Sequence, residues 1–453
     1  MLRQFYRLLA TFGRDRSGNV AITFALATLP LVGTVGAAVD YTQAHRVKAA
    51  LQSALDSAAL MLSRDATTLS SFELNTKAKN YVQAMLNQPQ TKDITVTAAY
   101  TTDGGSKVVV NGSASVPTAF MGIIGVNNVT ISGSSTAAWG TTRLRVALVL
   151  DNTGSMDSDG KMTALKTATK DLLTQLKGAA SVDGDVYVSI IPFAKDVNIG
   201  ATNYSASYID WTDWNSANKT CSGWLWNGTC YGGSWVTANH NTWNGCVTDR
   251  GPSGASPGTS TWDQIVTAPD GTTNSLWPAE QHNACPAPMM GLTTNWTNLN
   301  SLVDQMQPRG ATNQPIGLVW GWQSLVGGGP LTAPAKDSNY TYSDIIILMS
   351  DGLNTKDRWY GDGSNVSTAV DGRMYLSSTG AGTCANIKAS GVTIYTIQVN
   401  TSGDPTSTLL QNCAGSKDKM VDPSKFFIVT SASGIGTVFK QIGIGLTQLR
   451  VAK

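Results

Sequence analysis

The stretch LRVALVLDNTGSM, residues 144–156, constrains the fold more than any other part of the chain. Its apolar run 146–150 ends abruptly at Asp-Asn-Thr-Gly, which is typical of a buried strand in a parallel sheet. Asp151, Thr153 and Ser155 follow at the end of this run. One carboxylate and two hydroxyls are hard oxygen donors, the kind that Mg²⁺ or Ca²⁺ binds in proteins. The stretch therefore predicts a strand that leads into a metal-binding loop.

Two later segments strengthen this prediction. Residues 343–351, SDIIILMSD, form a second apolar run that ends in a carboxylate, Asp351. The segment PRGATN at 308–313 offers another hydroxyl, Thr312, just before a helical pattern. Because ligands gather beyond the carboxyl ends of parallel strands, we expect Asp151 and Asp351 on one edge, with Thr312 on a loop between them. The alternative is that these are ordinary polar residues that cap strands.

The pattern Asp151-Asn-Thr153-Gly-Ser155, then Thr312 and Asp351, resembles the metal-ion-dependent adhesion site of the von Willebrand factor A (VWA) domain. That family has Asp-x-Ser-x-Ser, then a distant Thr and a distant Asp; Thr153 replaces the first Ser and keeps its hydroxyl. The resemblance covers residues 144–449 by the order of elements. It implies an α/β fold with a doubly wound, mostly parallel sheet and helices on both faces. It also implies one bound Mg²⁺ (or Ca²⁺ or Mn²⁺) with a position open for a carboxylate from a protein partner.

The remaining pattern of this region alternates between strands and helices, as a right-handed parallel sheet requires. Further strands are expected at 186–193, 345–349, 392–399 and 426–429, and helices at 161–179, 299–306, 314–325, 384–390, 407–413 and 434–449.

The alternation stops over residues 198–299, which hold nine of the 13 Trp residues and four of the six Cys residues. This insert has almost no helical periodicity, so we expect an elaborated loop or an irregular subdomain, and a loop of this length is usually functional. Its Trp side chains can form the core of a small subdomain, a stacking surface for sugars or a partner protein, or both.

The six cysteines permit fifteen pairings and include no zinc-type CxxC pair. Cys384 and Cys413 open and close neighbouring predicted helices, so we pair them first. Proximity then pairs Cys221 with Cys230 and Cys246 with Cys285. The alternative is a set of reduced thiols in a cytosolic protein.

The N-terminal region predicts a membrane anchor. Residues 1–19 carry four arginines and one acid, and residues 20–39 contain no charge over about the length of a bilayer crossing. This charge order places residues 1–19 in the cytoplasm and the chain from Asp40 onward outside. A cleaved signal peptide and a buried core helix are the alternatives.

Residues 40–63 continue with apolar side chains at helical spacing. The segment RDRSGNVAITFALATLPLVGTVGAAVDYTQAHRVKAALQSALDSAAL resembles the N-terminus of TadE/TadG-like Flp pilus-assembly proteins. This resemblance implies a single-pass protein of the bacterial inner membrane, with a pilin-like helix and most of the chain in the periplasm or outside the cell. Residues 64–140 read as a small β-rich module.

Composition and motifs argue against several function classes. Charged residues make up 14% of the chain and the net charge is +2, so no basic excess exists to bind nucleic acid. The hydrolase-like pattern Gly-Ala-Ser-Pro-Gly at 254–258 lacks the strand before it and the helix after it. We therefore expect no enzyme, but an adhesion or pilus-assembly protein whose partner is a pilus component or a cell surface. A structural scaffold, or a hydrolase with its site in the insert, are the alternatives.

Overall fold

The computed structural model describes residues 18–102, 105–139, 142–230, 235–252, 262–327 and 330–451. The chain divides into two compact units, Met1–Trp139 and Gly140–Lys453, and each is described by itself. Nearly all of the predicted cytoplasmic segment 1–19, and the hydrolase-like pattern at 254–258, lie outside the described residues.

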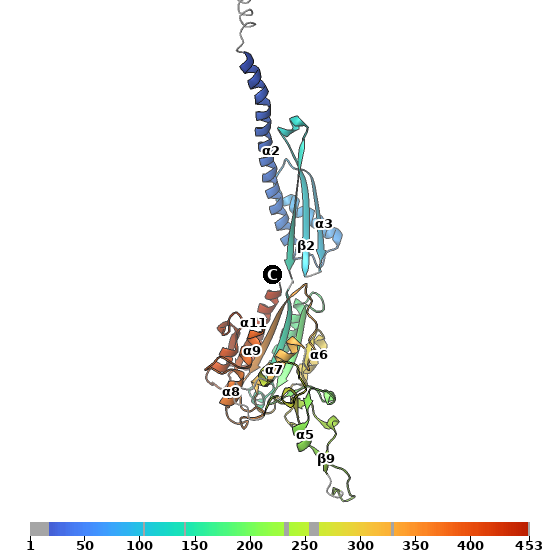
Figure 1. Cartoon of the computed structure of the whole chain (residues 1–453), viewed down its shortest axis with the longest axis vertical. Coiled ribbons are helices and arrows are strands. Elements are labelled where there is room, and N and C mark those ends of the chain that lie inside the picture. Colours follow the sequence, from blue (N-terminus) through green and yellow to red (C-terminus); the bar gives the residue numbers. More distant parts are fainter. Residues whose placement is uncertain are drawn as a thin grey trace, which may run out of the picture. The chain divides into compact units, whose positions relative to one another are not determined.

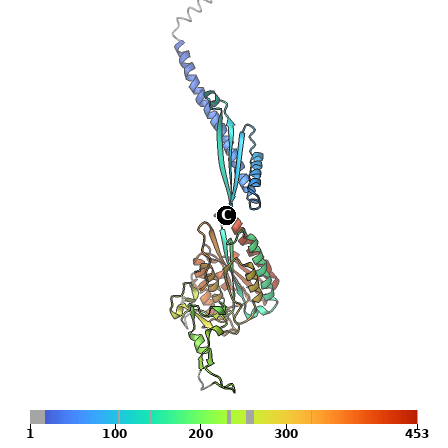
Figure 2. The ribbon, with the colours of Figure 1, turned by 90° about the vertical axis from the view of Figure 1, so that its right-hand side faces the viewer.

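The first unit is built on one long helix, α2 (Gly18–Leu62), which runs along a three-stranded antiparallel sheet (Figures 1 and 2). The strands are β1 (Lys92–Thr101), β2 (Ser106–Pro117) and β3 (Asn128–Trp139). Leu55 of α2 packs so closely on the sheet that a Cβ at Gly112 would lie 2.8 Å from its Cδ2. The absence of a side chain at Gly112 therefore allows the close packing of α2 on the sheet at this point.

The helix that was predicted to continue from residues 20–39 into residues 40–63 is present as the one continuous helix α2. One expectation for the first unit is corrected. The module 64–140 is not only β-rich, because it also contains α3 (Ser71–Met85). This helix begins with a capping box, in which Ser70 and Glu73 each accept a hydrogen bond from the other's backbone N–H.

Among the helices that the structure describes, none combines the length and the apolarity that a membrane crossing needs. The described helices include α2, over whose residues 20–39 a crossing was predicted.

The second unit is organised around a mixed sheet whose central part is parallel. Its strand order is β15 (Phe426–Val429), β14 (Thr393–Val399), β13 (Thr341–Ser350), β4 (Thr142–Asp151) and β5 (Val186–Phe193). The chain starts in the middle at β4, adds β5 on one side, and later adds β13, β14 and β15 on the other. The expected α/β fold with a mostly parallel sheet is thus confirmed.

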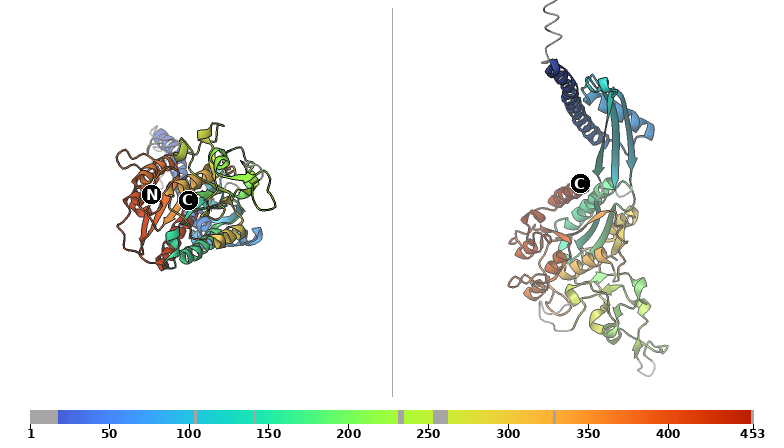
Figure 3. Two further views of the ribbon diagram at one scale, coloured as in Figure 1. Left: turned by 90° about the horizontal axis from the view of Figure 1, so that it is seen from below. Right: turned by 45° about the horizontal axis from the view of Figure 1, so that its top comes forward.

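Both faces of this sheet are covered by helices, as the figures show (Figures 2 and 3). Val146 and Leu148 of β4 belong to a core shared with α4 (Lys161–Ala179), α6 (Trp296–Gln305) and α11 (Ala432–Val451). Ala147 and Val149 point to the opposite core, shared with α7, α8, α9 and α10. These helices are α7 (Gln314–Val326), α8 (Thr368–Met374), α9 (Thr383–Ala389) and α10 (Thr408–Cys413). The predicted helices are all present, and α8 is an addition.

The insert is not an isolated irregular loop, because it extends the central sheet. β6 (Val197–Asn198) pairs antiparallel with β5, and β10 (Cys246–Val247), β11 (Trp277–Glu280) and β7 (Ile209–Asp210) follow in that order. β12 (Met290–Thr293) also pairs with β5. The β8–β9 hairpin (Lys219–Cys221, Trp235–Thr237) and the short helix α5 (Thr212–Ala217) project beyond the sheet (Figure 1).

The tryptophans of the insert include both buried and exposed side chains. Trp214, Trp243 and Trp277 are buried and form its core. Trp226 and Trp235 of the projecting hairpin region are exposed. The exposed pair is available for contact with a partner, whereas the buried ones supply the apolar core of this segment.

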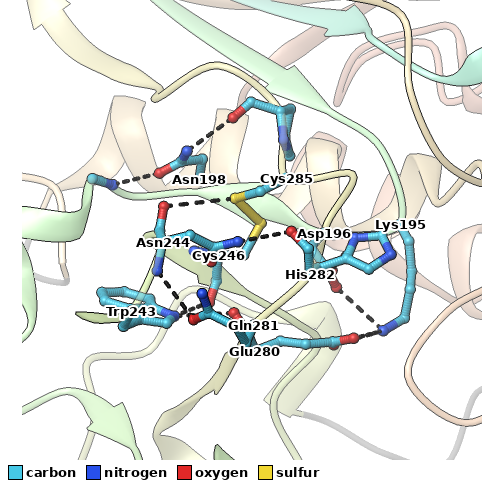
Figure 4. Close-up of a disulfide and its surroundings, with 12 residues drawn as sticks. Lys195, Asp196, Asn198, Trp243, Asn244, Cys246, Glu280, Gln281, His282 and Cys285 are labelled. Atoms are coloured by element: carbon cyan, nitrogen blue, oxygen red, sulfur yellow. Dashed lines mark hydrogen bonds and ion pairs between the residues drawn. A yellow bond between two sulfur atoms is a disulfide. The ribbon is translucent and has the colours of Figure 1, made fainter. Parts of the chain in front are cut away.

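The three disulfides are the predicted ones: Cys221–Cys230, Cys246–Cys285 and Cys384–Cys413. Figure 4 shows the second of them beside Trp243 and Asn244 of the insert. It joins β10 to the loop that follows β11, so it holds together the strands that extend the sheet.

Candidate metal centre

The candidate site lies where the winding direction of the sheet changes. Strands β4 and β13 are neighbours, with Leu150 opposite Met349. Asp151 is the last residue of β4, and Asp351 comes directly after β13. The topology thus brings the two carboxylates to the same edge, at the switch point where doubly wound sheets bind ligands.

A chain of short polar contacts joins three of the predicted ligands. The hydroxyls of Thr153 and Ser155 are 3.0 Å apart, and Ser155 Oγ donates to Asp351 Oδ1 at 2.6 Å. Asp151 lies beneath them and accepts a hydrogen bond from the backbone N–H of Thr153 at 2.8 Å. These contacts show that the loop after β4 turns its side-chain oxygens toward Asp351.

Thr312 reaches the same place from the loop before α7. A Cβ built on Gly352 would lie 3.7 Å from both Ser155 Oγ and Thr312 Oγ1, so both hydroxyls border the space that the missing side chain of Gly352 leaves. The Thr312 backbone is fixed by Thr355, whose hydroxyl accepts from the Thr312 N–H and whose own N–H donates to the Thr312 carbonyl. Ser155, Thr312 and Asp351 line one open pocket of about 270 Å³.

Asp151 is fully buried, and burial has the largest influence on its pKa. Burial raises the pKa of Asp151 to about 7, and the nearby Asp351 carboxylate raises it as well. Hydrogen bonds from Ser350 and Thr153 act in the opposite direction. A buried carboxylate with a raised pKa is a group that a cation would stabilise in its charged form.

Lys161 is the functional residue that the sequence analysis missed. Its Nζ lies 2.5 Å from Asp351 Oδ2, and both side chains are almost completely buried. Lys161 is also the first residue of α4, where a positive charge is disfavoured by the helix dipole. A basic first residue in the helix that follows the Asp151 loop was the available signal, because such a residue needs an acidic partner from elsewhere in the fold.

The donor set fits a hard divalent cation. It consists of two carboxylates and three hydroxyls from loops that contact one another, and it contains no nitrogen or sulfur ligand. Gly154 donates its N–H to the Gly310 carbonyl at 2.9 Å. This bond joins the loop after β4 to the loop that carries Thr312. In the described part of the chain, no group of three or more His, Cys, Asp or Glu residues is arranged to hold a metal.

The site is connected to the insert through Asn313, the residue after Thr312. Its side-chain amide donates to the Lys195 carbonyl at 3.0 Å and to Asp249 Oδ2 at 2.8 Å. Lys195 in turn pairs with Glu280 of β11, at 2.6 Å, as Figure 4 shows. Although burial lowers it, the carboxylates of Asp196 and Glu280 keep the pKa of Lys195 above its ordinary value. Ion pairs and amides therefore tie the loop of Thr312 to the insert.

Comparison with known families gives one match, near the N-terminus. Residues 18–61 match the family model described as putative Flp pilus-assembly TadE/G-like. This segment lies within α2. No curated protein matches the chain.

Several solved structures have a similar arrangement at low sequence identity. The pilus adhesin SpaC of Lactobacillus rhamnosus GG is 16% identical with a TM-score of 0.34, over 80% of this chain and 35% of that one. The PilB minor pilin of Streptococcus sanguinis is 11% identical with a TM-score of 0.37, over 79% of each chain. The vWF domain of the type V pili tip protein Mfa5 of Porphyromonas gingivalis is 12% identical with a TM-score of 0.35, over 69% and 97%. The chain spans about a third of the length of SpaC. At these TM-scores the likenesses carry no functional argument.

Proposed function

We propose that the chain is a pilus-associated protein of the cell envelope that binds a partner protein through a divalent cation. Asp151, Thr153, Ser155, Thr312 and Asp351 would hold the cation, with Mg²⁺ as the first candidate and Ca²⁺ or Mn²⁺ as alternatives. The partner would supply a carboxylate to the open side of the site. The family match over residues 18–61 supports the association with pili and the envelope.

One observation carries the proposal for the site. Side-chain oxygens from three separate loops converge on one open pocket, and a fully buried carboxylate with a raised pKa lies beneath them. When bound, a divalent cation supplies positive charge that can attract an anionic group. The chain's own residues orient the hydroxyls and leave one side open, so a partner carboxylate can approach from solvent.

The direct test is cation binding by the purified full chain, measured with Mn²⁺ by electron paramagnetic resonance. Binding that is lost in Asp151→Asn and kept in Thr167→Val would support the site, because Thr167 is an exposed hydroxyl on α4. Partner binding is then tested with a cell-envelope fraction, in Mg²⁺ and in EDTA. A partner released by EDTA from a protein that stays folded would support adhesion.

A scaffold role is the second candidate, and the Lys161–Asp351 pair favours it. This pair already supplies a positive charge to Asp351, so the loops hold together without a metal. In that case a cation would raise the melting temperature but leave partner binding unchanged. Partner binding that is insensitive to EDTA, together with normal Mn²⁺ binding, would decide for the scaffold. We propose no enzymatic activity.

A further inference from the structure

The insert borders a second cavity, which we call the insert cavity. It has a volume of about 570 Å³ and is lined from α5, from the segment after β10, from η7 (Thr273–Ser275), from β11 and from the loop after β13. Pockets that bind small molecules occupy about 300–1,000 Å³. None of its described lining residues belongs to the pocket of the metal site. The insert cavity is therefore a separate place at which a ligand can bind.

One buried hydroxyl in the floor of the insert cavity, that of Thr248, points to such a ligand. Thr248 lies directly after β10, is 3% exposed and donates its backbone N–H to the Pro278 carbonyl at 3.1 Å. Among the residues that the structure describes, none forms a hydrogen bond with its Oγ1. A buried polar group without a partner destabilises a fold, so such a group in a cavity wall indicates a ligand or a bound water molecule.

The charged side chains of the cavity wall are mostly paired with one another. Lys195 Nζ lies 2.6 Å from Glu280 Oε2, as Figure 4 shows. Arg358 Nη2 lies 2.8 Å from Asp213 Oδ2. An ionic ligand would have to break one of these pairs and leave a charge without its partner, which is costly in a partly buried site. The ion pairs of the lining therefore favour a neutral ligand.

The other polar side chains of the lining suit a ligand that carries hydroxyl groups. Asp210 is the fifth charged residue of the described lining, and it accepts hydrogen bonds from the backbone N–H and the hydroxyl of Thr212. The rest are hydroxyls and amides, which donate and accept without carrying charge. They belong to Thr212, Asn218, Thr273, Asn274 and Gln281.

Trp359 gives the insert cavity an aromatic wall. Arg373 Cζ lies 4.1 Å from the centroid of one of its rings, a cation–π contact that fixes the orientation of the indole. Its Nε1 is buried and has no hydrogen-bond partner among the described residues. A sugar ring has a face of C–H groups that packs on an aromatic ring, and hydroxyls at its edge that accept from an indole N–H. Trp359 can therefore contact both kinds of surface of a sugar.

We propose that the insert cavity binds a short neutral saccharide. Trp359 packs on the sugar ring, Thr248 exchanges a hydrogen bond with a sugar hydroxyl, and the amides of the lining hold the neighbouring sugar unit. An anion would compete with the paired carboxylates, and the three carboxylates of the described lining are not arranged to hold a metal ion. The proposal depends neither on the metal site nor on the family match.

The test is saturation-transfer difference NMR with the full chain in EDTA, which keeps a bound cation out of the measurement. The neutral probes are chitobiose, which represents envelope glycans, and lactose and mannobiose, which represent glycans of foreign surfaces. At least one of them should bind, and its C–H protons should receive the strongest saturation. Absence of binding by all three at millimolar concentration would overturn the proposal, and so would binding of the anionic sialyllactose alone.

Two substitutions in the wall test the contacts themselves. Thr248→Val keeps the shape of the side chain and should raise the Kd about three- to tenfold. Trp359→Leu should raise it at least about tenfold. The matched control is Thr169→Val on α4, because Thr169 also has a buried hydroxyl without a hydrogen-bond partner among the described residues but does not line the cavity. Circular dichroism checks that each variant is folded.

A steric variant tests the cavity without changing a buried residue. Ala217 of α5 is exposed and lines the cavity, so Ala217→Phe should narrow its mouth and abolish binding. The same substitution at the exposed neighbour Ser216, which is not part of the described lining, should bind like the parent chain. Unchanged binding in Ala217→Phe would overturn the proposal. Loss of binding in Trp226→Ala would do the same, because it would place the saccharide on the exposed hairpin.

Discussion

The ammonium group of Lys161 lies 2.5 Å from Oδ2 of Asp351, and neither side chain has appreciable contact with solvent. Lys161 thus occupies one side of the carboxylate whose other oxygen accepts from Ser155. A cation bound at this site, as proposed above, would share Asp351 with the lysine. The balance between the two positive charges would then determine how strongly the domain depends on metal.

Replacing this lysine should make the fold depend on the cation. Lys161→Met leaves Asp351 buried without its counter-charge, and removal of one partner of a buried pair costs about 3–5 kcal/mol. We expect that loss in EDTA and a substantial recovery in Mg²⁺, measured by urea unfolding. Lys170→Met on the same helix is the control, because its pair with Asp304 is exposed and worth about 0–1 kcal/mol. Equal effects of Lys161→Met with and without Mg²⁺ would contradict the prediction.

Stability without metal should fall as the pH rises. Burial raises the pKa of Asp151 from 3.8 to about 7, so between these values the folded state holds a proton that the unfolded chain has lost. The free energy of unfolding therefore decreases from about pH 4 to about pH 7 in EDTA. Asp151→Asn should flatten this dependence in part, since burial also raises the pKa of Asp249 to about 7. A slope unchanged in the variant would mean that Asp151 is charged throughout.

Mg²⁺ should stabilise the second unit in proportion to occupancy, by about 2.7 kcal/mol at a hundredfold excess over Kd. Thr153→Ser keeps the hydroxyl and should leave this gain almost unchanged, whereas Thr153→Val removes it and should raise the Kd. Asp151→Ala should abolish the gain. It need not lower the melting temperature in EDTA, because the repulsion from Asp351 is removed as well. Differential scanning fluorimetry over a Mg²⁺ series measures all three, and a full response in Asp151→Ala would place the cation elsewhere.

Reduction should loosen the insert before the central sheet. Cys246–Cys285 closes a loop with a sequence separation of 39 residues, and a disulfide of this kind contributes about 2–4 kcal/mol. The strands that it joins are only two and four residues long. Limited proteolysis under reducing conditions should therefore cut first within 198–299. Alkylation of the cysteines in the native protein without a reductant would show that the bridges do not form.

The elements that could be predicted from the sequence are the strands that are buried on both faces. The runs 146–150 and 345–349 are apolar without interruption because each faces two helical layers. Their end points place Asp151 and Asp351 at one edge by topology alone. This reasoning also located the loops of Ser155 and Thr312, since both loops follow or precede elements with clear periodicity.

The missed features depend on weaker or non-local signals. Helix α3 buries only Leu74, Ala78 and Val82, so its apolar pattern is sparse, and its capping box was the better signal. Several strands of the insert have two residues and exist because they pair with an existing sheet edge, which no periodicity can reveal. The role of Lys161 depends on its ion pair with Asp351, which is 190 positions further along the chain.

The attachment of the insert has a mechanical consequence. β6 and β12 are both hydrogen-bonded to β5, and the Cys246–Cys285 bridge joins β10 to the loop after β11. A pulling force applied to the exposed hairpin of Trp226 and Trp235 is therefore transmitted to β5 and to the edge that carries Asp151. The cross-link joins β10 to the loop after β11, so force that reaches β10 is shared with that loop. Because the exposed hairpin is attached to the sheet in this way, we expect it to bear tension while the loops of the insert keep their geometry.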